Sequence, residues 1–201
     1  MSEILEALLG SKAKTRIIRF FLLNYDKEFS VVDISKRNML IASVARKEIN
    51  ELKRIKLLTE KVKKGTKYYM LDQKFCFYPE LKSLFAKSTA SPDSKGLARI
   101  KNIGDVKLAL ISGIFLNYPK SKVDMVLVAN NVSRGKLKSV MSILEAEIGK
   151  EVSFVLMNSD EFKYRIDMLD RFLLDFMEGT HLTLIDKVPG LKRIILSRKK
   201  Y

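Results

Sequence analysis

Cysteine, histidine and long apolar stretches are scarce in this sequence of 201 residues. The single cysteine, Cys76, excludes an intramolecular disulfide and a zinc site built from several cysteines. The single histidine, His181, excludes a metal site built from several histidines, and we expect it to have a structural role. Cys76 lies in the apolar run Phe75–Tyr78, which favours a buried packing residue.

Other absences concern membranes and nucleotides. No apolar run approaches the ~18–20 residues needed to span a bilayer. The first residues, Met1-Ser2-Glu3, lack the basic flank and cleavage pattern of a signal peptide. The Gly-x-Gly-x-x-Gly fingerprint and the P-loop are also absent. We therefore expect a cytoplasmic protein with no membrane partner and no cofactor.

Positive charge is what the sequence has in excess. The formal net charge is +15, from 38 Lys and Arg against 23 Asp and Glu. Residues 1–90 hold 19 basic and 10 acidic residues, a charge of +9, and residues 91–201 hold 19 and 13, a charge of +6. Nucleic acid is the commonest partner of such a chain, and an acidic membrane surface is the weaker alternative.

Residues 30–72 carry the most informative pattern. It predicts a short helix, a tight turn, a longer helix and a hairpin of two strands. In order, these are Ser30–Arg37, Asn38–Leu40, a helix from Ile41 or Ser43 to about Ile55, and strands Leu57–Val62 and Lys67–Leu71 joined by Lys63–Thr66. This order is typical of a winged helix-turn-helix.

The longer helix has two chemically different faces. At 100° per residue, Ala45, Ile49 and Leu52 share the face expected to be buried. Glu48 and Glu51 fall at the sides. The opposite face holds Ser43, Arg46, Lys47, Asn50 and Arg54. In the major groove, Arg or Lys can pair with guanine and Asn with adenine.

The hairpin that follows is basic. Gly65 permits the positive φ that a tight hairpin tip requires. Phosphate or minor-groove contacts are expected from Lys61, Lys63, Lys64 and Lys67. Any surface helix has a solvated polar face, and that alternative stays open for the helix alone. The short helix, the turn and the basic hairpin around it favour DNA binding.

The second half of the chain alternates between strand and helix patterns. We divide the chain into a DNA-binding domain (1–87), a linker (88–96), an α/β domain (97–190) and a basic tail (191–201). Strands are predicted at Val106–Phe115, Val123–Ala129, Val152–Met157 and Leu182–Ile185, and helices at Ser133–Ile148 and from Asn158 or Ser159 to Glu178 with a bend near Ile166–Asp167.

Two resemblances add to these patterns. Residues 12–85 resemble the winged-helix domains of ArsR/MarR-type transcriptional regulators, through Ser43–Leu52 and Leu57–Lys61. Residues 97–188 resemble the minimal nucleotidyltransferases of the DNA polymerase β superfamily. The residues that carry this second resemblance are Leu110–Gly113, Ser121–Val128, Leu144–Leu156 and Asp160–Arg165.

The chemistry of that transferase family needs a Gly-Ser pair and three carboxylates that hold two magnesium ions. Here the Gly-Ser position reads Ser112-Gly113, and the first carboxylate position is Lys122. Asp124 occupies the second, and the third falls near Ser153. A lysine repels Mg²⁺, so the resemblance implies a transferase-like domain that is inactive and holds no metal. Asp124 could equally be a strand-end carboxylate paired with Lys122 or Lys120.

The expected fold is thus an α+β winged helix followed by an α/β nucleotidyltransferase-like domain with a small mixed sheet. The expected function is transcription regulation, with double-stranded DNA as the partner and no enzymatic activity. We expect the second domain to hold a small ligand or to provide a protein–protein surface. A homodimer would form through helix 2–9 of the first domain or through the stripe Leu169, Phe172, Leu173 and Phe176 of the second. The alternatives are a nucleotidyltransferase targeted by its winged helix and a winged helix that binds protein.

Overall fold

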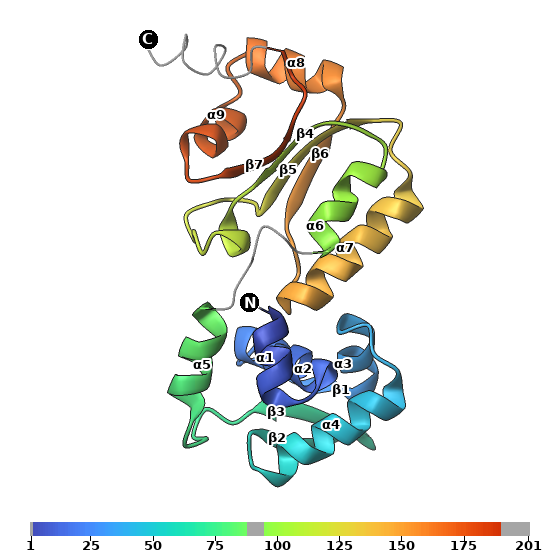
Figure 1. The fold of residues 1–201 in the computed structure, drawn as a ribbon, viewed down its shortest axis with the longest axis vertical. Helices are drawn as coiled ribbons and strands as arrows, with labels where there is room; N and C mark the ends of the chain where they lie inside the picture. Colours follow the sequence, from blue (N-terminus) through green and yellow to red (C-terminus); the bar gives the residue numbers. More distant parts are fainter. Residues whose placement is uncertain (1, 88–94, 190–201) are drawn as a thin grey trace. The chain divides into compact units, whose positions relative to one another are not determined.

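The protein has an α+β fold with two small β-sheets in the computed structural model, which describes residues 2–87 and 95–189 (Figure 1). It divides into two compact units, one of residues 2–87 and 142–151 and one of residues 95–141 and 152–189. The sequence-based division placed 142–151 in the second domain. Linker residues 88–94 and the tail 191–201 lie outside the described residues, and residues 95 and 96 begin a helix.

Two helices in the first unit begin where polar side chains accept their first backbone N–H groups. Ser11 accepts a hydrogen bond from Lys14 N at the start of one helix. Ser30 and Asp33 form a reciprocal capping box at the start of another. The helices are α1 (Ser2–Leu9), α2 (Lys12–Leu23), α3 (Val31–Arg37), α4 (Ala42–Arg54) and α5 (Tyr78–Lys87).

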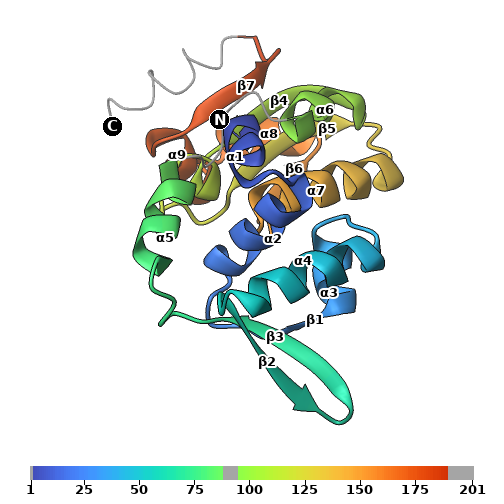
Figure 2. The same ribbon diagram turned by 60° about the horizontal axis from the view of Figure 1, so that its bottom comes forward.

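The sheet of the first unit has the order β1-β3-β2 and is antiparallel. Its strands are β1 (Phe29–Ser30), β2 (Leu58–Lys63) and β3 (Thr66–Leu71). The helix–turn–helix and hairpin predicted for residues 30–72 are therefore present, and Figure 2 shows the hairpin extending away from the helices of this unit. The short strand β1 was not predicted, because two residues carry no readable periodicity.

The core of the first unit comes from α2, α3, α4 and the inner face of its sheet. Its most deeply buried side chains include Ile17, Phe21, Ile34, Ile49 and Leu52. Helix α1 adds only part of its apolar residues to this core. Leu5 is buried and Leu9 packs against the core, whereas Ile4 and Leu8 are exposed.

The prediction that Cys76 is buried is wrong, because its side chain is exposed. Residues 75–77 of the apolar run around it form backbone turns instead of a helix or a strand. Phe75 N donates to Asp72 O, and Tyr78 N donates to Phe75 O. In such turns, neighbouring side chains point in different directions, and only the rings of Phe75 and Tyr78 pack against the core.

This exposure has a measurable consequence. The Cys76 thiol should react fully with Ellman's reagent in native buffer, with one equivalent released per chain, because nothing needs to unfold for access. The Cys76→Ser variant is the blank. A thiol that reacts only after urea is added would contradict the exposed position.

The second unit is built around a four-stranded mixed sheet of order β6-β5-β4-β7. β5 pairs with β6 in parallel, and β4 pairs antiparallel with both β5 and β7. The strands are β4 (Asp105–Ile111), β5 (Met125–Asn130), β6 (Phe154–Met157) and β7 (Leu182–Asp186). The prediction of a small mixed sheet is confirmed.

Helices cover both faces of this sheet. Figure 1 shows α8 (Ser159–Asp167) and α9 (Arg171–Glu178) on one side. The other side carries α6 (Lys95–Arg99), the 3₁₀ turn η1 (Ile100–Asn102) and the first part of α7 (Arg134–Ile148). Leu173 and Phe176 are core residues beneath the sheet, Phe172 is partly buried, and Leu169 is exposed. The proposed homodimer stripe is thus mostly core.

Two predicted elements end differently. The strand expected to reach Phe115 stops at Ile111, because Gly113 has a φ of 50° and starts the 3₁₀ turn η2 (Gly113–Phe115). The helix expected through Glu178 is two helices. Leu169, with a φ of 56°, separates them, and Asp170 caps the second by accepting from Leu173 N. The predicted bend near Ile166–Asp167 is close to this break.

Candidate nucleic-acid interface

Helix α4 has the two faces that its sequence predicts. Ala45, Ile49 and Leu52 are 0–1% exposed and anchor the helix in the core. The five residues predicted to face DNA are all exposed, namely Ser43, Arg46, Lys47, Asn50 and Arg54. Packing on one side therefore fixes the rotation of the helix and leaves this polar face open to a partner.

The two acidic residues of α4, which the helical period places at its sides, contact α2. Glu48 is buried and accepts a hydrogen bond from the Ser11 hydroxyl. Lys14 Nζ lies 2.7 Å from Glu51 and 3.6 Å from Glu48. The hydrogen bond between Lys14 and Glu51 raises the pKa of Lys14 and lowers the pKa of Glu51. The acids of α4 are therefore held by α2 and form no salt bridge with the helix's own polar face.

The hairpin turn is fixed by two residues with positive φ. Lys64 has a φ of 48° and Gly65 a φ of 76°, between the paired residues Lys63 and Thr66. Two such residues define a two-residue turn of the type that matches the twist of an antiparallel hairpin. The prediction for Gly65 is confirmed, and Lys64 stands exposed at the tip.

Glutamates neutralise part of the charge on the hairpin. Glu28 lies 3.2 Å from Lys61 Nζ and also contacts Lys63, and Glu60 lies 3.1 Å from Lys67 Nζ. The hydrogen bond from Lys63, followed by that from Lys61, lowers the pKa of Glu28. The sequence did not predict that Glu28 and Glu60 would pair with these lysines. Which side chains lie next to one another across a sheet depends on how its strands pair, and the sequence does not show that pairing.

Glu60 holds a second cation as well. Lys53 Nζ, from the last turn of α4, lies 2.7 Å from Glu60 Oε2. This bond is the main reason that the pKa of Glu60 is lowered and the pKa of Lys53 is raised. Lys53, Lys61, Lys63 and Lys67 are thus engaged within the unit. Within residues 2–87 and 95–189, no salt bridge is made by Arg46, Lys47, Arg54 or Lys64.

The second unit brings together three of its four predicted transferase-site residues. Asp124 is 8% exposed. Its carboxylate accepts the Ile114 N–H at 2.8 Å, and it accepts the N–H and hydroxyl of Ser153 at 2.9 and 2.8 Å. A Cβ on Gly113 would lie 2.1 Å from Asp124 Oδ1. Ser112 donates its hydroxyl to Thr180 O at 2.6 Å.

Lys122, the fourth residue, is directed elsewhere. Its Nζ lies 3.1 Å from Asp175 Oδ2. The alternative that Asp124 pairs with Lys122 or Lys120 is therefore wrong, since Asp124 binds backbone and hydroxyl donors instead. These bonds tie the start of η2 to the residue before β6. In the part of the chain that the structure describes, no three His, Cys, Asp or Glu side chains gather as metal ligands would.

A hollow of about 380 Å³ adjoins Ser112 and Lys122. Its wall combines rings, hydroxyl groups and charges of both signs. The residues that line it are Ser112, Tyr118, Lys120, Ser121, Lys122, Phe172, Asp175, Phe176, Glu178 and Gly179. Two lysines and two acids balance in formal charge, so the hollow does not by itself select an anion over a cation.

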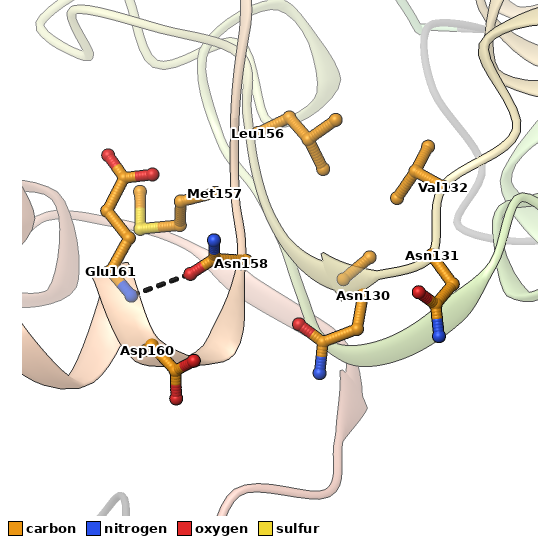
Figure 3. Close-up of a pocket in the computed structure, with 9 residues that line it drawn as sticks. Asn130, Asn131, Val132, Leu156, Met157, Asn158, Asp160 and Glu161 are labelled. Atoms are coloured by element: carbon orange, nitrogen blue, oxygen red, sulfur yellow. Dashed lines mark hydrogen bonds between the residues drawn. The ribbon is translucent and has the colours of Figure 1, made fainter.

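A second hollow, of about 500 Å³, lies where the parallel strands β5 and β6 end (Figure 3). Asn130 and Asn158 line it, but their amides already hold the backbone. Asn130 exchanges two hydrogen bonds with Ser159, and Asn158 accepts from Glu161 N at 2.7 Å. These bonds give the asparagines a structural role at the start of α8.

Comparison of the chain with models of protein families, with curated proteins and with solved structures finds no match.

Proposed function

We propose that the first unit is a winged helix-turn-helix and that the protein is a transcription regulator that binds duplex DNA. The polar face of α4 would lie in the major groove, with β2 and β3 as the wing beside it. The observation that carries the proposal is the pairing of a fully buried face of α4 with an exposed face holding Arg46, Lys47 and Asn50. Those two cations make no salt bridge with any described residue.

Charge supports the same assignment. Within the described residues, the acids near α4 are engaged by lysines of the same unit, so the excess positive charge remains on the polar face of α4 and on the hairpin tip. Phosphate contacts by exposed cations supply most of the sequence-independent affinity for DNA. Side chains such as arginine and asparagine can read base edges in addition.

The second unit has a different part in the proposal. It is a nucleotidyltransferase-like domain without transferase activity, used for sensing or assembly. The supporting observation is that the Asp124 carboxylate is occupied by three protein donors, and that Lys122 stands at a metal-ligand position. The hollow beside Ser112 and Lys122 is the place where a small ligand would bind.

Selection of duplexes from a random library by the intact protein tests the proposal. Enrichment of a shared sequence, with affinity that falls steeply as salt rises, is the expected result. Binding that is weak at low salt, or equal for all sequences, would overturn specific regulation. Incubation with labelled nucleoside triphosphates and Mg²⁺ or Mn²⁺ tests the second unit, and reproducible transfer would overturn its inactive assignment.

The wing lysines should differ in their effect on DNA affinity. Lys64→Ala should reduce the slope of log affinity against log salt by about one, because the side chain is free to bind a phosphate. Lys61→Ala should change the slope less, since Lys61 must first leave Glu28. Fluorescence anisotropy with a labelled duplex between about 50 and 200 mM salt measures both slopes.

Glu28→Gln is the matched control for the wing. It removes the charge that holds Lys61 and Lys63, so the slope should become steeper and the affinity at low salt should rise. Equal slopes for the Lys61 and Lys64 variants, together with no effect of Glu28→Gln, would show that the glutamates do not restrain the wing.

A further inference from the structure

Exposed apolar side chains lie at the N-terminal end of α4, next to its polar face. Ile41 is 74% exposed and Val44 is 38% exposed. They are one helical turn apart, and Val44 is also one turn from Lys47, which is exposed on the polar face. What distinguishes these two from other exposed apolar side chains is their position beside the proposed base-reading residues, where the partner that binds α4 would cover them.

Ile41 is also a poor residue for the start of a helix. The helices α2, α3, α8 and α9 follow polar residues whose side chains accept a backbone hydrogen bond. Helix α4 follows Ile41, which makes no side-chain cap. Serine, threonine, asparagine or aspartate at this position would stabilise the helix. Neither capping nor burial therefore accounts for an isoleucine there.

The chemistry of duplex DNA offers one matching group. Isoleucine and valine have no hydrogen-bond donor, so they cannot bind phosphates or the polar edges of bases. The C5-methyl group of thymine is the apolar group that the major groove presents. Arg46 and Lys47 carry the positive charge that brings this end of the helix to DNA, and no described residue forms a salt bridge with them.

We propose that Ile41 and Val44 contact thymine methyl groups and so make the preferred DNA site depend on thymine. The inference rests on the proposed binding of duplex DNA by α4, and it adds a specificity determinant to that function. Arg46, Lys47 and Asn50 pair with polar base edges, whereas Ile41 and Val44 select against cytosine at a neighbouring position, because cytosine lacks the methyl group.

Deoxyuridine provides the test, because it differs from thymidine only by that methyl group. Each thymine of the library-selected site is replaced in turn by deoxyuridine, and affinities are measured for the intact protein. At one or two positions, replacement should weaken binding about fourfold, the effect of one buried methyl group. Ile41→Ser and Val44→Ser should each lose affinity for the thymine site and become insensitive to deoxyuridine at one of these positions.

Two readouts separate this role from a structural one. Ile41→Ser supplies the missing cap, so its melting temperature should rise by about 2–5 °C while its DNA affinity falls. Ile55→Ser, at the opposite end of α4 and 50% exposed, should keep the full sensitivity to deoxyuridine.

The outcomes are distinct. If no site is selected from the library, the proposed DNA-binding function fails, and this inference fails with it. If a site is selected but every deoxyuridine replacement is silent for the unsubstituted protein, the inference alone is overturned. It is also overturned if Ile41→Ser and Val44→Ser retain the sensitivity of the unsubstituted protein.

Discussion

Replacing Gly113 with alanine should lower the free energy of unfolding of the second unit by about 3–5 kcal/mol. The added Cβ would lie 2.1 Å from Asp124 Oδ1, so the carboxylate must move and release the Ile114 N–H. The φ of 50° at this position adds strain for any residue with a side chain. Urea denaturation followed by circular dichroism, with hydrogen exchange to locate the unfolding unit, measures the effect.

Gly135 is the matched control. It lies in the first turn of α7, its φ is not positive, and an added Cβ meets no atom within 4 Å. Gly135→Ala should therefore stabilise the helix by about 0.5–1 kcal/mol. Glycine-to-alanine substitution in this unit should therefore lower the free energy of unfolding at position 113, where the new Cβ clashes with Asp124, and raise it at position 135, where it meets no atom.

A double-mutant cycle assigns the loss to Asp124. Asp124→Ala should cost about 2–4 kcal/mol, because it leaves Ile114 N–H and Ser153 without their acceptor. The double variant Gly113→Ala, Asp124→Ala should cost clearly less than the sum of the two single changes, since the clash is gone. Additive losses would show that the carboxylate does not constrain position 113.

The second large effect concerns DNA. Arg46→Ala should make the free energy of binding to the selected site less favourable by about 1–3 kcal/mol and relax the preference at one base pair. Asn50→Ala should have an effect of the same size, with the preference relaxed at a different base pair. The helix itself should remain folded, because both side chains are exposed opposite its buried face. Measurement against the selected site and single-base variants separates reading of a base from general attraction.

Two variants sharpen this test. Arg46→Lys keeps the charge but loses the two-pronged hydrogen bonding of the guanidinium, so specificity at one position should relax while affinity for unrelated DNA remains. Lys74→Ala removes one positive charge from an exposed loop of the same unit and should leave specificity unchanged. If Arg46→Ala and Asn50→Ala each weaken binding to all sequences equally, α4 does not read bases.

The sequence was sufficient for features set by neighbours along the chain. The positive φ at Gly65 and the buried face of α4 follow from local geometry and helical period. The ends of the two helices and of the two hairpin strands in residues 30–72 were predicted to within two residues for the same reason.

Features set by distant residues were beyond the sequence. The ion pairs of Glu28 with the hairpin lysines arise because Glu28 precedes β1, which pairs with β3, and no local pattern reports that pairing. The partners of Asp124 come from positions 114 and 153. Cys76 was misassigned because apolar composition was taken as burial, although the backbone turns there expose the thiol.

The position of β3 at the centre of its sheet limits how related chains can vary in length. β3 pairs with β1 on one side and β2 on the other, and Tyr69 and Leu71 point inward. A one-residue insertion within β3 would turn both side chains to water and shift the register with both neighbours. In a family alignment, gaps within this hairpin should therefore fall at Lys64-Gly65, and the strands on either side should be free of them.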